Sequence, residues 1–137
     1  MNMTERTAPA QSGGRILVVD DEEKNRRLLA DLLTAEGYLV RTANDGVEAL
    51  ESAAEFRPDA VLLDIMMPRL DGVEACRRLK ADPATSSIPI LITTALHERS
   101  DRLKGIRAGA NDFISKPLDT EEVASRVRNA ICLKRLH

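Results

Sequence analysis

Residues 60–64, AVLLD, decide the fold that we predict for this chain. Four apolar residues followed directly by an acid are typical of a parallel strand that is buried on both faces and ends at a polar edge. Two further apolar runs lie at 16–19 and 90–93, and weaker strand patterns lie at 38–43 and 112–114. Longer segments of helical period separate the five. This alternation predicts an α/β fold in which helices cover a parallel sheet.

Five strands joined by right-handed crossovers predict a flavodoxin-like doubly wound parallel sheet, with strand order 2-1-3-4-5 and helices on both faces. The helix expected over residues 97–108 is predicted to turn Leu103 and Ile106 toward the sheet, and Gly109 is placed to end it. In this topology, ligands bind at the carboxyl ends of the strands, beside the first and third strands. The residues that follow the strands are therefore the candidates for a functional site.

Length and charge limit the classes of protein to which the chain can belong. Its 137 residues are enough for one domain, and 20 basic side chains against 22 acidic ones leave a net charge of −2. Without excess positive charge, direct nucleic-acid binding is not expected, and no apolar window is long enough for a membrane span. We expect residues 1–14 to form a disordered leader and residues 15–137 one domain. Cys76 and Cys132 lie far apart, so we expect reduced thiols and a cytoplasmic protein.

Chemically active side chains follow four of the five predicted strands. They are Asp20 and Asp21 after the first strand, Asp64 after the third, Thr93 and Thr94 at the end of the fourth and Lys116 after the fifth. Parallel strands place their carboxyl ends on one edge, so we expect these side chains to converge. Three carboxylates in one crevice repel one another unless a cation relieves the charge. Mg²⁺, which prefers oxygen ligands, is the predicted cofactor, and Lys116 supplies a second positive charge.

Asp64 is the best candidate for a nucleophile that attacks phosphorus. Its strand is central, and the two acids after the first strand are better placed to hold the metal. The metal and Lys116 would relieve the repulsion between the carboxylate and a phosphoryl group. Asp59 is the rival acid, but it precedes the apolar run and belongs at the opposite end of the sheet. Taken alone, Asp20 and Asp21 could merely cap a helix, and Lys116 could be a surface lysine.

These motifs, in this order and at this spacing, resemble the receiver domains of bacterial two-component response regulators over residues 15–134. The resemblance rests on four stretches: VVDDEE at 18–23, LLDIMMPRLDG at 62–72, ITTA at 92–95 and GANDFISKP at 109–117. It implies a phosphoprotein of a phosphorelay in signal transduction, which accepts a phosphoryl group from a sensor histidine kinase or a phosphotransfer protein. It also implies that the chain phosphorylates and dephosphorylates itself but is no enzyme with an external substrate.

Carried over residue by residue, the resemblance implies that Asp64 is the phosphorylated residue. Asp20 and Asp21 would hold Mg²⁺ together with Asp64 and the backbone carbonyl of Met66. One departure concerns the positions that flank the path of the hydrolytic water in the family. Met66 and Leu96 are both apolar here, so neither can orient that water, and we hypothesise slow self-dephosphorylation.

The resemblance also implies how phosphorylation changes the surface. Thr94 and Lys116 would bind the phosphoryl group, and the Lys116–Pro117 peptide bond would be cis. Phe113 matches the switch position, where an aromatic ring turns inward once Thr94 has moved toward Asp64. The face formed by the fourth helix, the fifth strand and the last helix then changes shape and controls an output domain or a partner. In the family this face often mediates dimerisation, so a homodimer is a further possibility.

Two other classes of protein use similar residues or the same topology. A magnesium-dependent phosphatase of the haloacid dehalogenase type has a second acid two residues after its nucleophile, but that position is Met66 here. A flavin-binding protein needs a phosphate-cradling loop after the first strand and aromatic rings, but this chain has acids there and few aromatics: Tyr38, Phe56 and Phe113. A receiver that binds partners without phosphorylation would lack an acid or the lysine, and none is missing.

Overall fold

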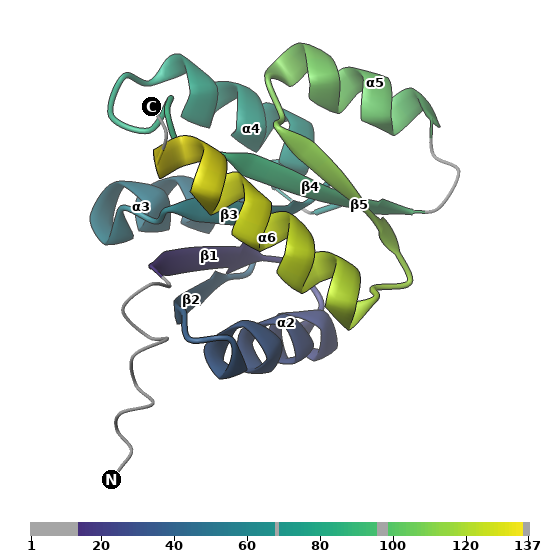
Figure 1. The fold of residues 1–137 in the computed structure, drawn as a ribbon. Coiled ribbons are helices and arrows are strands. Elements are labelled where there is room, and N and C mark those ends of the chain that lie inside the picture. Colours follow the sequence, from purple (N-terminus) through teal and green to yellow (C-terminus); the bar gives the residue numbers. More distant parts are fainter. Residues whose placement is uncertain (1–13, 68, 96–98, 136–137) are drawn as a thin grey trace, which may run out of the picture.

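The computed structural model describes residues 14–67, 69–95 and 99–135, in which strands and helices alternate (Figure 1). The strands are β1 (Arg15–Val19), β2 (Leu39–Ala43), β3 (Ala60–Asp64), β4 (Ile90–Ala95) and β5 (Asp112–Lys116). The helices are α2 (Glu23–Ala35), α3 (Gly46–Phe56), α4 (Gly72–Ala81), α5 (Arg99–Ala108) and α6 (Thr120–Arg135). None of the helices within these ranges has the length and apolar character needed to cross a membrane.

The strands form one parallel sheet in the order β2-β1-β3-β4-β5, which confirms the predicted flavodoxin-like topology. Helices α2 and α6 cover one face of the sheet, and α3, α4 and α5 cover the other (Figure 1). The register pairs Asp64 on β3 with Thr93 on β4, and Ala95 on β4 with Lys116 on β5. The carboxyl ends of these strands therefore lie along one edge of the molecule.

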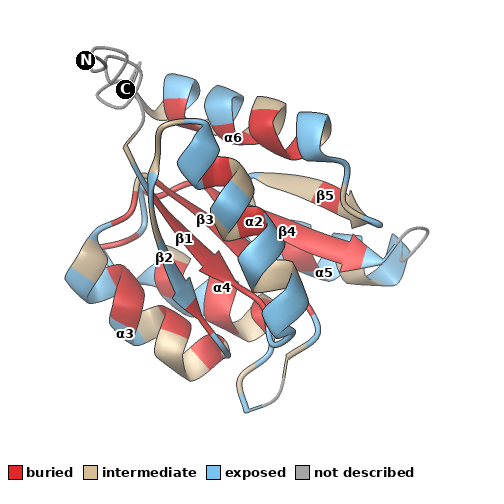
Figure 2. Cartoon of the chain, turned by 90° about the horizontal axis from the view of Figure 1, so that it is seen from below, coloured by how far each residue is buried: buried red, intermediate tan, exposed pale blue. Residues whose placement is uncertain are grey.

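Alternate residues of the central strands supply two separate hydrophobic cores. Leu17 and Val19 on β1 pack on the side of α3 and α4, whereas Ile16 and Val18 pack on the side of α2 and α6. Figure 2 shows β1, β3 and β4 buried along nearly their whole length. Because a one-residue slip would exchange the residues of the two faces, this double burial fixes the register and hence which residues reach the carboxyl edge.

The prediction for the fourth helix was wrong about its buried side. Leu103 and Ile106 on α5 are 44% and 57% exposed, and the buried positions are Gly105 and Ala108. The cause is the Phe113 ring, because a Cβ atom on Gly105 would lie 2.8 Å from that ring. Helix α5 thus meets the sheet through its smallest residues and turns two apolar side chains outward. The predicted start of this helix, at residue 97, lies outside the described residues.

Side-chain caps fix the starts of the two helices that flank the loop after β3. The Asp45 carboxylate accepts a hydrogen bond from the Glu48 backbone N–H at 2.9 Å, and Asp71 accepts one from Glu74 at the same distance. Each carboxylate satisfies a backbone donor that the first turn of a helix leaves free. After α5, Gly109 has a φ of 100°, a left-handed conformation that favours glycine, and it ends the helix as predicted.

Candidate functional site

Three acids meet at the carboxyl edge of the sheet. Asp20 and Asp21 follow β1, Asp64 is the last residue of β3, and one carboxylate oxygen of each lies within 4.8 Å of the other two. Asp20 and Asp64 are only 1% and 3% exposed, whereas Asp21 is exposed. Two buried carboxylates at such short range repel each other strongly unless positive charge lies between them.

Lys116, the last residue of β5, supplies positive charge to this cluster. Its Nζ lies 3.2 Å from Oδ1 of Asp64 and 3.6 Å from Oδ2 of Asp20. Burial lowers the pKa of Lys116, but the charges of Asp64 and Asp20 outweigh this effect, so that its pKa is raised and the amine is charged at neutral pH. The peptide bond from Lys116 to Pro117 is cis.

The pKa of the Asp64 carboxyl is raised above its ordinary value. Burial and the neighbouring charge of Asp20 raise its pKa to about 6, although Lys116 and a hydrogen bond from the Met66 backbone N–H act in the opposite direction. The backbone beside it is also tightly packed, since a Cβ atom on Gly72 would lie 2.3 Å from the carbonyl oxygen of Asp64. The nucleophile candidate therefore lies in a tightly packed pocket in which Lys116 offsets only part of the negative charge.

Asp20 is held in place by its own backbone as well as by its side chain. Its N–H donates to the carbonyl of Ala43 at 3.2 Å, and its carbonyl accepts a hydrogen bond from the Arg26 guanidinium at 2.7 Å. One carboxylate oxygen, Oδ1, accepts from the Glu22 N–H at 2.9 Å. The other, Oδ2, has no hydrogen-bond partner among the described residues. The roles of Arg26 and Ala43 were missed by sequence analysis, because neither position carries a recognisable signal.

A divalent cation fits this arrangement of donors. The cluster offers three carboxylates within reach of one ion, and the buried Oδ2 of Asp20 accepts no hydrogen bond among the described residues, with only Nζ of Lys116 near it at 3.6 Å. Hard oxygen donors are those that Mg²⁺ prefers. Lys116 lies near Asp64 but neutralises only one of the negative charges. The pocket therefore has both the ligands and the uncompensated charge that a magnesium ion requires.

Three further predicted residues, Thr94, Phe113 and Met66, lie within the described residues. Thr94 on β4 is buried, and its hydroxyl oxygen has no hydrogen-bond partner among the residues that the structure describes. Phe113 on β5 is partly buried, with the guanidinium of Arg102 lying 5.3 Å from its ring centroid. The Met66 side chain is 70% exposed. Leu96 lies outside the described residues.

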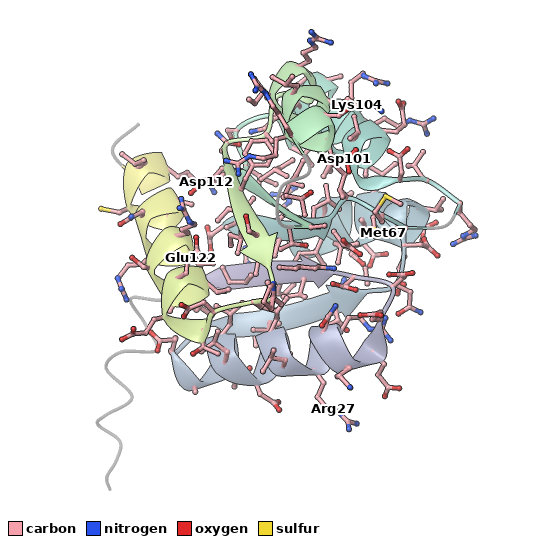
Figure 3. The ribbon with its side chains drawn as sticks, turned by 90° about the vertical axis from the view of Figure 1, so that its right-hand side faces the viewer. Arg27, Met67, Asp101, Lys104, Asp112 and Glu122 are labelled. Atoms are coloured by element: carbon pink, nitrogen blue, oxygen red, sulfur yellow. The ribbon has the colours of Figure 1, made fainter. Side chains whose placement is uncertain are left out.

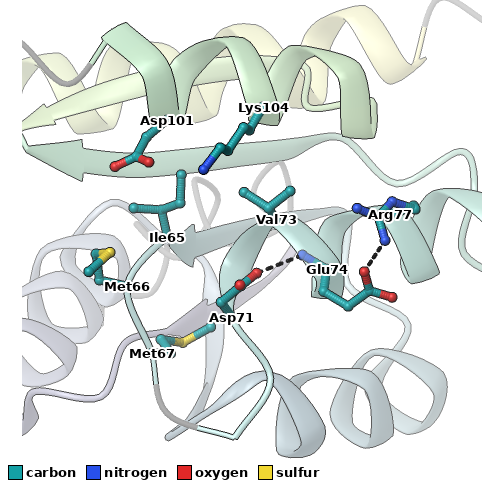
Figure 4. Close-up of a pocket in the computed structure, with 9 residues that line it drawn as sticks. All are labelled: Ile65, Met66, Met67, Asp71, Val73, Glu74, Arg77, Asp101 and Lys104. Carbon is teal, nitrogen blue, oxygen red and sulfur yellow. Dashed lines mark hydrogen bonds and ion pairs between the residues drawn. The ribbon is translucent and has the colours of Figure 1, made fainter.

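A cleft lies against the loop that follows β3, which contributes Ile65, Met66 and Met67 to its lining. It has a volume of about 520 Å³ and separates α4 from α5 (Figure 4). Figure 4 shows Asp101 and Lys104 on α5 directed across it toward Ile65 and Met66. Since Asp20, Asp21 and Lys116 do not line this cleft, the acidic pocket and the cleft are separate features.

The chain matches one protein family over most of its length. The family model for the response regulator receiver domain matches residues 16–128. The chain is 54% identical over 115 residues to the response regulator PleD of Caulobacter vibrioides, a match that covers 84% of this chain and 25% of PleD. The response regulator MprA of Mycobacterium leprae is 50% identical over 114 residues, covering 83% of this chain and 49% of MprA.

A solved structure gives the same result for the fold. The receiver domain of the sensor histidine kinase PA1611 from Pseudomonas aeruginosa PAO1, which carries a magnesium ion in its active-site cleft, superimposes with a TM-score of 0.81 and 34% identity, covering 87% of this chain and 98% of that one. The chain belongs to the response regulator receiver family. It spans a quarter of PleD and about half of MprA.

Members of this family are phosphoacceptor switches of bacterial two-component signal transduction. They bind Mg²⁺ at an acidic pocket and interact with histidine kinases or phosphotransfer proteins. They are signalling switches, and nothing in the match indicates an enzyme that turns over a substrate. The chain is therefore neither a phosphatase of the haloacid dehalogenase type nor a flavin-binding protein.

The raised pKa of Asp64 leads to a prediction about stability. The pKa is about 6 in the folded protein against 3.8 for an ordinary Asp, so between these values the folded state binds more protons than the unfolded state. The free energy of unfolding should therefore rise as the pH falls through about 6, and ionised Asp64 should be destabilising above it. In a metal chelator near pH 7, we expect Asp64→Asn to be more stable than the wild type by roughly 1–3 kcal/mol.

Thermal unfolding in chelator, at about pH 7.5 and about pH 5.5, measures this difference. The gain of Asp64→Asn should shrink at the lower pH, where the wild-type carboxyl is protonated. Added Mg²⁺ should stabilise the wild type and have little effect on the variant, because a ligand stabilises only the state that binds it. Asp31→Asn, at an exposed acid on α2, is the matched control. A variant less stable than the wild type at the higher pH would contradict the electrostatic account.

Proposed function

We propose that this chain accepts a phosphoryl group on Asp64 in a magnesium-dependent reaction and thereby switches a signalling output. The observation that carries the proposal is the pocket in which three acids and Lys116 converge, with Nζ of Lys116 3.2 Å from the Asp64 carboxylate. Repulsion among clustered carboxylates lowers the stability of the fold, so a purely structural role does not explain the cluster. Lys116, together with a bound divalent ion, would give a phosphoryl group the positive charge that it needs.

The metal ligands in this proposal are the carboxylates of Asp20, Asp21 and Asp64 and the backbone carbonyl of Met66. The bound ion would neutralise the negative charge that gathers on the phosphoryl oxygens during transfer. Fixation of Asp20 by Ala43 and Arg26 supports this role, because metal ligands act best when their orientation is set in advance.

Transfer consists of one bond made and one bond broken at phosphorus. A carboxylate oxygen of Asp64 attacks in line, and the bond to the donor breaks with its electron pair leaving on the donor atom, the histidine nitrogen of a kinase or phosphotransfer protein. Lys116 would pair with a phosphoryl oxygen, and the Thr94 hydroxyl would donate to another. The hydroxyl of Thr94 is suited to this because no other hydrogen bond engages it among the described residues.

The switch would act through the face of α5, β5 and α6. Movement of Thr94 toward the phosphoryl group would vacate the space into which the Phe113 ring turns. The phosphoryl group would favour this inward state because it makes contacts there that it does not make in the outward state. The exposed Leu103 and Ile106 lie on α5 of this face. On β5 and α6, Asp112 and Glu122, which are labelled in Figure 3, both pair with Arg126.

The proposed partners are a sensor histidine kinase or phosphotransfer protein as donor and, through the α5, β5 and α6 face, a second copy of the chain or an output partner. We propose a cytoplasmic location and no direct contact with nucleic acid or membrane. The chain would phosphorylate itself from the donor and hydrolyse its own phosphate, without turnover of an outside substrate.

The experiment that tests the function is a measurement of intact mass. After incubation with acetyl phosphate and Mg²⁺, the protein should gain the mass of one phosphoryl group, and it should gain nothing when the metal is chelated. Small phosphoesters should not be turned over under the same conditions. Steady release of phosphate from them would contradict the assignment as a switch.

The lifetime of the phosphoryl group should depend on Met66. Its side chain, two residues after Asp64, is 70% exposed, and a thioether cannot orient a water by a strong hydrogen bond. Replacing it by Asn should speed dephosphorylation about fivefold, since one new hydrogen bond to the attacking water is worth about 1 kcal/mol. The decay of phosphorylated protein in Mg²⁺ buffer measures the rate, and Met66→Leu is the apolar control. An Asn variant that decays as slowly as the Leu variant would remove the hypothesis.

A further inference from the structure

An ion pair ties the loop after β3 to the start of α3. The Arg69 guanidinium contacts both carboxylate oxygens of Asp45, with Nε to Oδ2 at 3.0 Å, Nη2 to Oδ1 at 3.0 Å and Nη2 to Oδ2 at 2.8 Å. The Asp45 side chain is 14% exposed and also caps α3 through the Glu48 N–H. These hydrogen bonds, from Glu48 first and then from Arg69, hold the pKa of Asp45 below its usual value.

The backbone on either side of this ion pair is tightly packed. Arg69 has a φ of 68°, a left-handed conformation that a non-glycine residue adopts at a cost in energy. One residue on, the Leu70 carbonyl oxygen lies only 2.2 Å from where a Cβ atom on Gly46 would be. The loop and the first turn of α3 therefore meet backbone against backbone, and the side chain of Arg69 closes the contact.

The two segments that Arg69 joins are those that hold the metal ligands. On one side, Ala43, two residues before Asp45, accepts the hydrogen bond from the N–H of Asp20. On the other side, Met66 lies two residues after Asp64 and donates its backbone N–H to that carboxylate. Arg69 and Asp45 thus complete a ring of contacts that runs from Asp20 through the end of β2 to the loop and back to Asp64.

We propose that Arg69 is a positioning residue for the metal site: through Asp45 it fixes the loop that carries Met66, and so sets the affinity for Mg²⁺. This rests on the proposed function only in that the pocket binds the ion. An exposed arginine would ordinarily contribute little through a surface ion pair, and Arg69 is 60% exposed. Here its partner is partly buried, with 14% of its side chain exposed, and the contact is made to both oxygens, which is the geometry that fixes a position.

The test is the affinity for Mg²⁺ measured by calorimetric titration of the whole chain. Arg69→Gln should bind Mg²⁺ about tenfold more weakly than the wild type, the lower end of the effect expected when a group that orients metal ligands is lost. Asp45→Ser keeps a residue that can cap α3 but cannot reach Arg69, and it should show a similar loss. The double variant should be no weaker than the weaker single one, since both changes break the same contact.

Arg41→Gln is the matched control. It also removes an arginine that forms an ion pair, here with Glu55 at 3.2 Å, but this pair does not involve the metal ligands. Its affinity for Mg²⁺ should equal that of the wild type. At saturating Mg²⁺, phosphoryl uptake by Arg69→Gln should approach the wild-type rate, because the loss lies in metal binding. A purely structural role would lower the unfolding temperature and leave the affinity unchanged, and that result would overturn the proposal.

The outcomes also separate this inference from the proposed function. If the wild type binds Mg²⁺ but takes up no phosphoryl group from acetyl phosphate, the proposed function fails while the role of Arg69 stands. If uptake is normal and Arg69→Gln binds Mg²⁺ as tightly as the wild type, only the role of Arg69 fails.

Discussion

Protein carrying Asp64→Asn is expected to gain no phosphoryl group from acetyl phosphate in the presence of Mg²⁺. An amide has no free carboxylate oxygen to attack phosphorus, and the other two acids of the pocket are assigned to the metal. The loss should be complete on the time scale in which the wild type is fully modified, as measured by intact mass.

This loss must be separated from a failure to fold. The expected stabilisation of the metal-free variant provides that control, because a protein that unfolds at higher temperature and gains no phosphate has lost chemistry alone. Asp59→Asn is the matched substitution, since Asp59 lies at the opposite end of β3 and pairs with Lys134 at 3.4 Å. It should be phosphorylated like the wild type. Residual uptake by Asp64→Asn at a comparable rate would show that another residue accepts the group.

The second large effect is expected for Lys116→Met. Its ammonium lies 3.2 Å from Asp64, so its loss removes a charge aimed at the oxygens that become more negative during transfer. By analogy with the removal of one such donor from other transition states, the rate of phosphoryl uptake at saturating Mg²⁺ should fall about 10²-fold. The initial rate of mass gain at fixed acetyl phosphate measures it.

Two further variants make the result interpretable. Lys116→Arg keeps the charge but changes its shape, and it should retain more activity than the Met variant. Lys134→Met removes a lysine that also pairs with an acid, at the other end of the sheet, and it should take up phosphate normally. A rate for Lys116→Met within about twofold of the wild type would mean that the metal alone supplies the electrostatic stabilisation.

The sheet could be predicted because its signal is local. Continuous apolar runs such as 60–63 are typical of a strand that is buried on both faces, and the handedness of the crossovers then favours one order of strands. The buried side of α5 could not be predicted in the same way. Leu103 and Ile106 have the residue type and spacing of a core stripe, yet the Phe113 ring fills the space beneath the helix. Such a tertiary contact leaves no trace in the sequence of the helix itself.

The convergence of the acids with Lys116 was predicted because each follows a strand, and the ends of parallel strands share an edge. The supporting contacts were not predicted. The left-handed conformation of Arg69 has no signal in its residue type, and its partner Asp45 is 24 residues away in the sequence. Contacts between loops depend on backbone conformations that only the folded chain defines, which is why the convergence of the acids was predicted and the contacts that support it were not.

The most direct test of the central claim is to locate the phosphoryl group by tandem mass spectrometry after incubation with acetyl phosphate and Mg²⁺. The account predicts one modified residue, Asp64, on the peptide that contains the end of β3, and no modified peptide when a chelator replaces the metal. A phosphoryl group found on Asp20, on Asp21 or on a hydroxyl residue, or equal modification of Asp64 without a divalent ion, would contradict it.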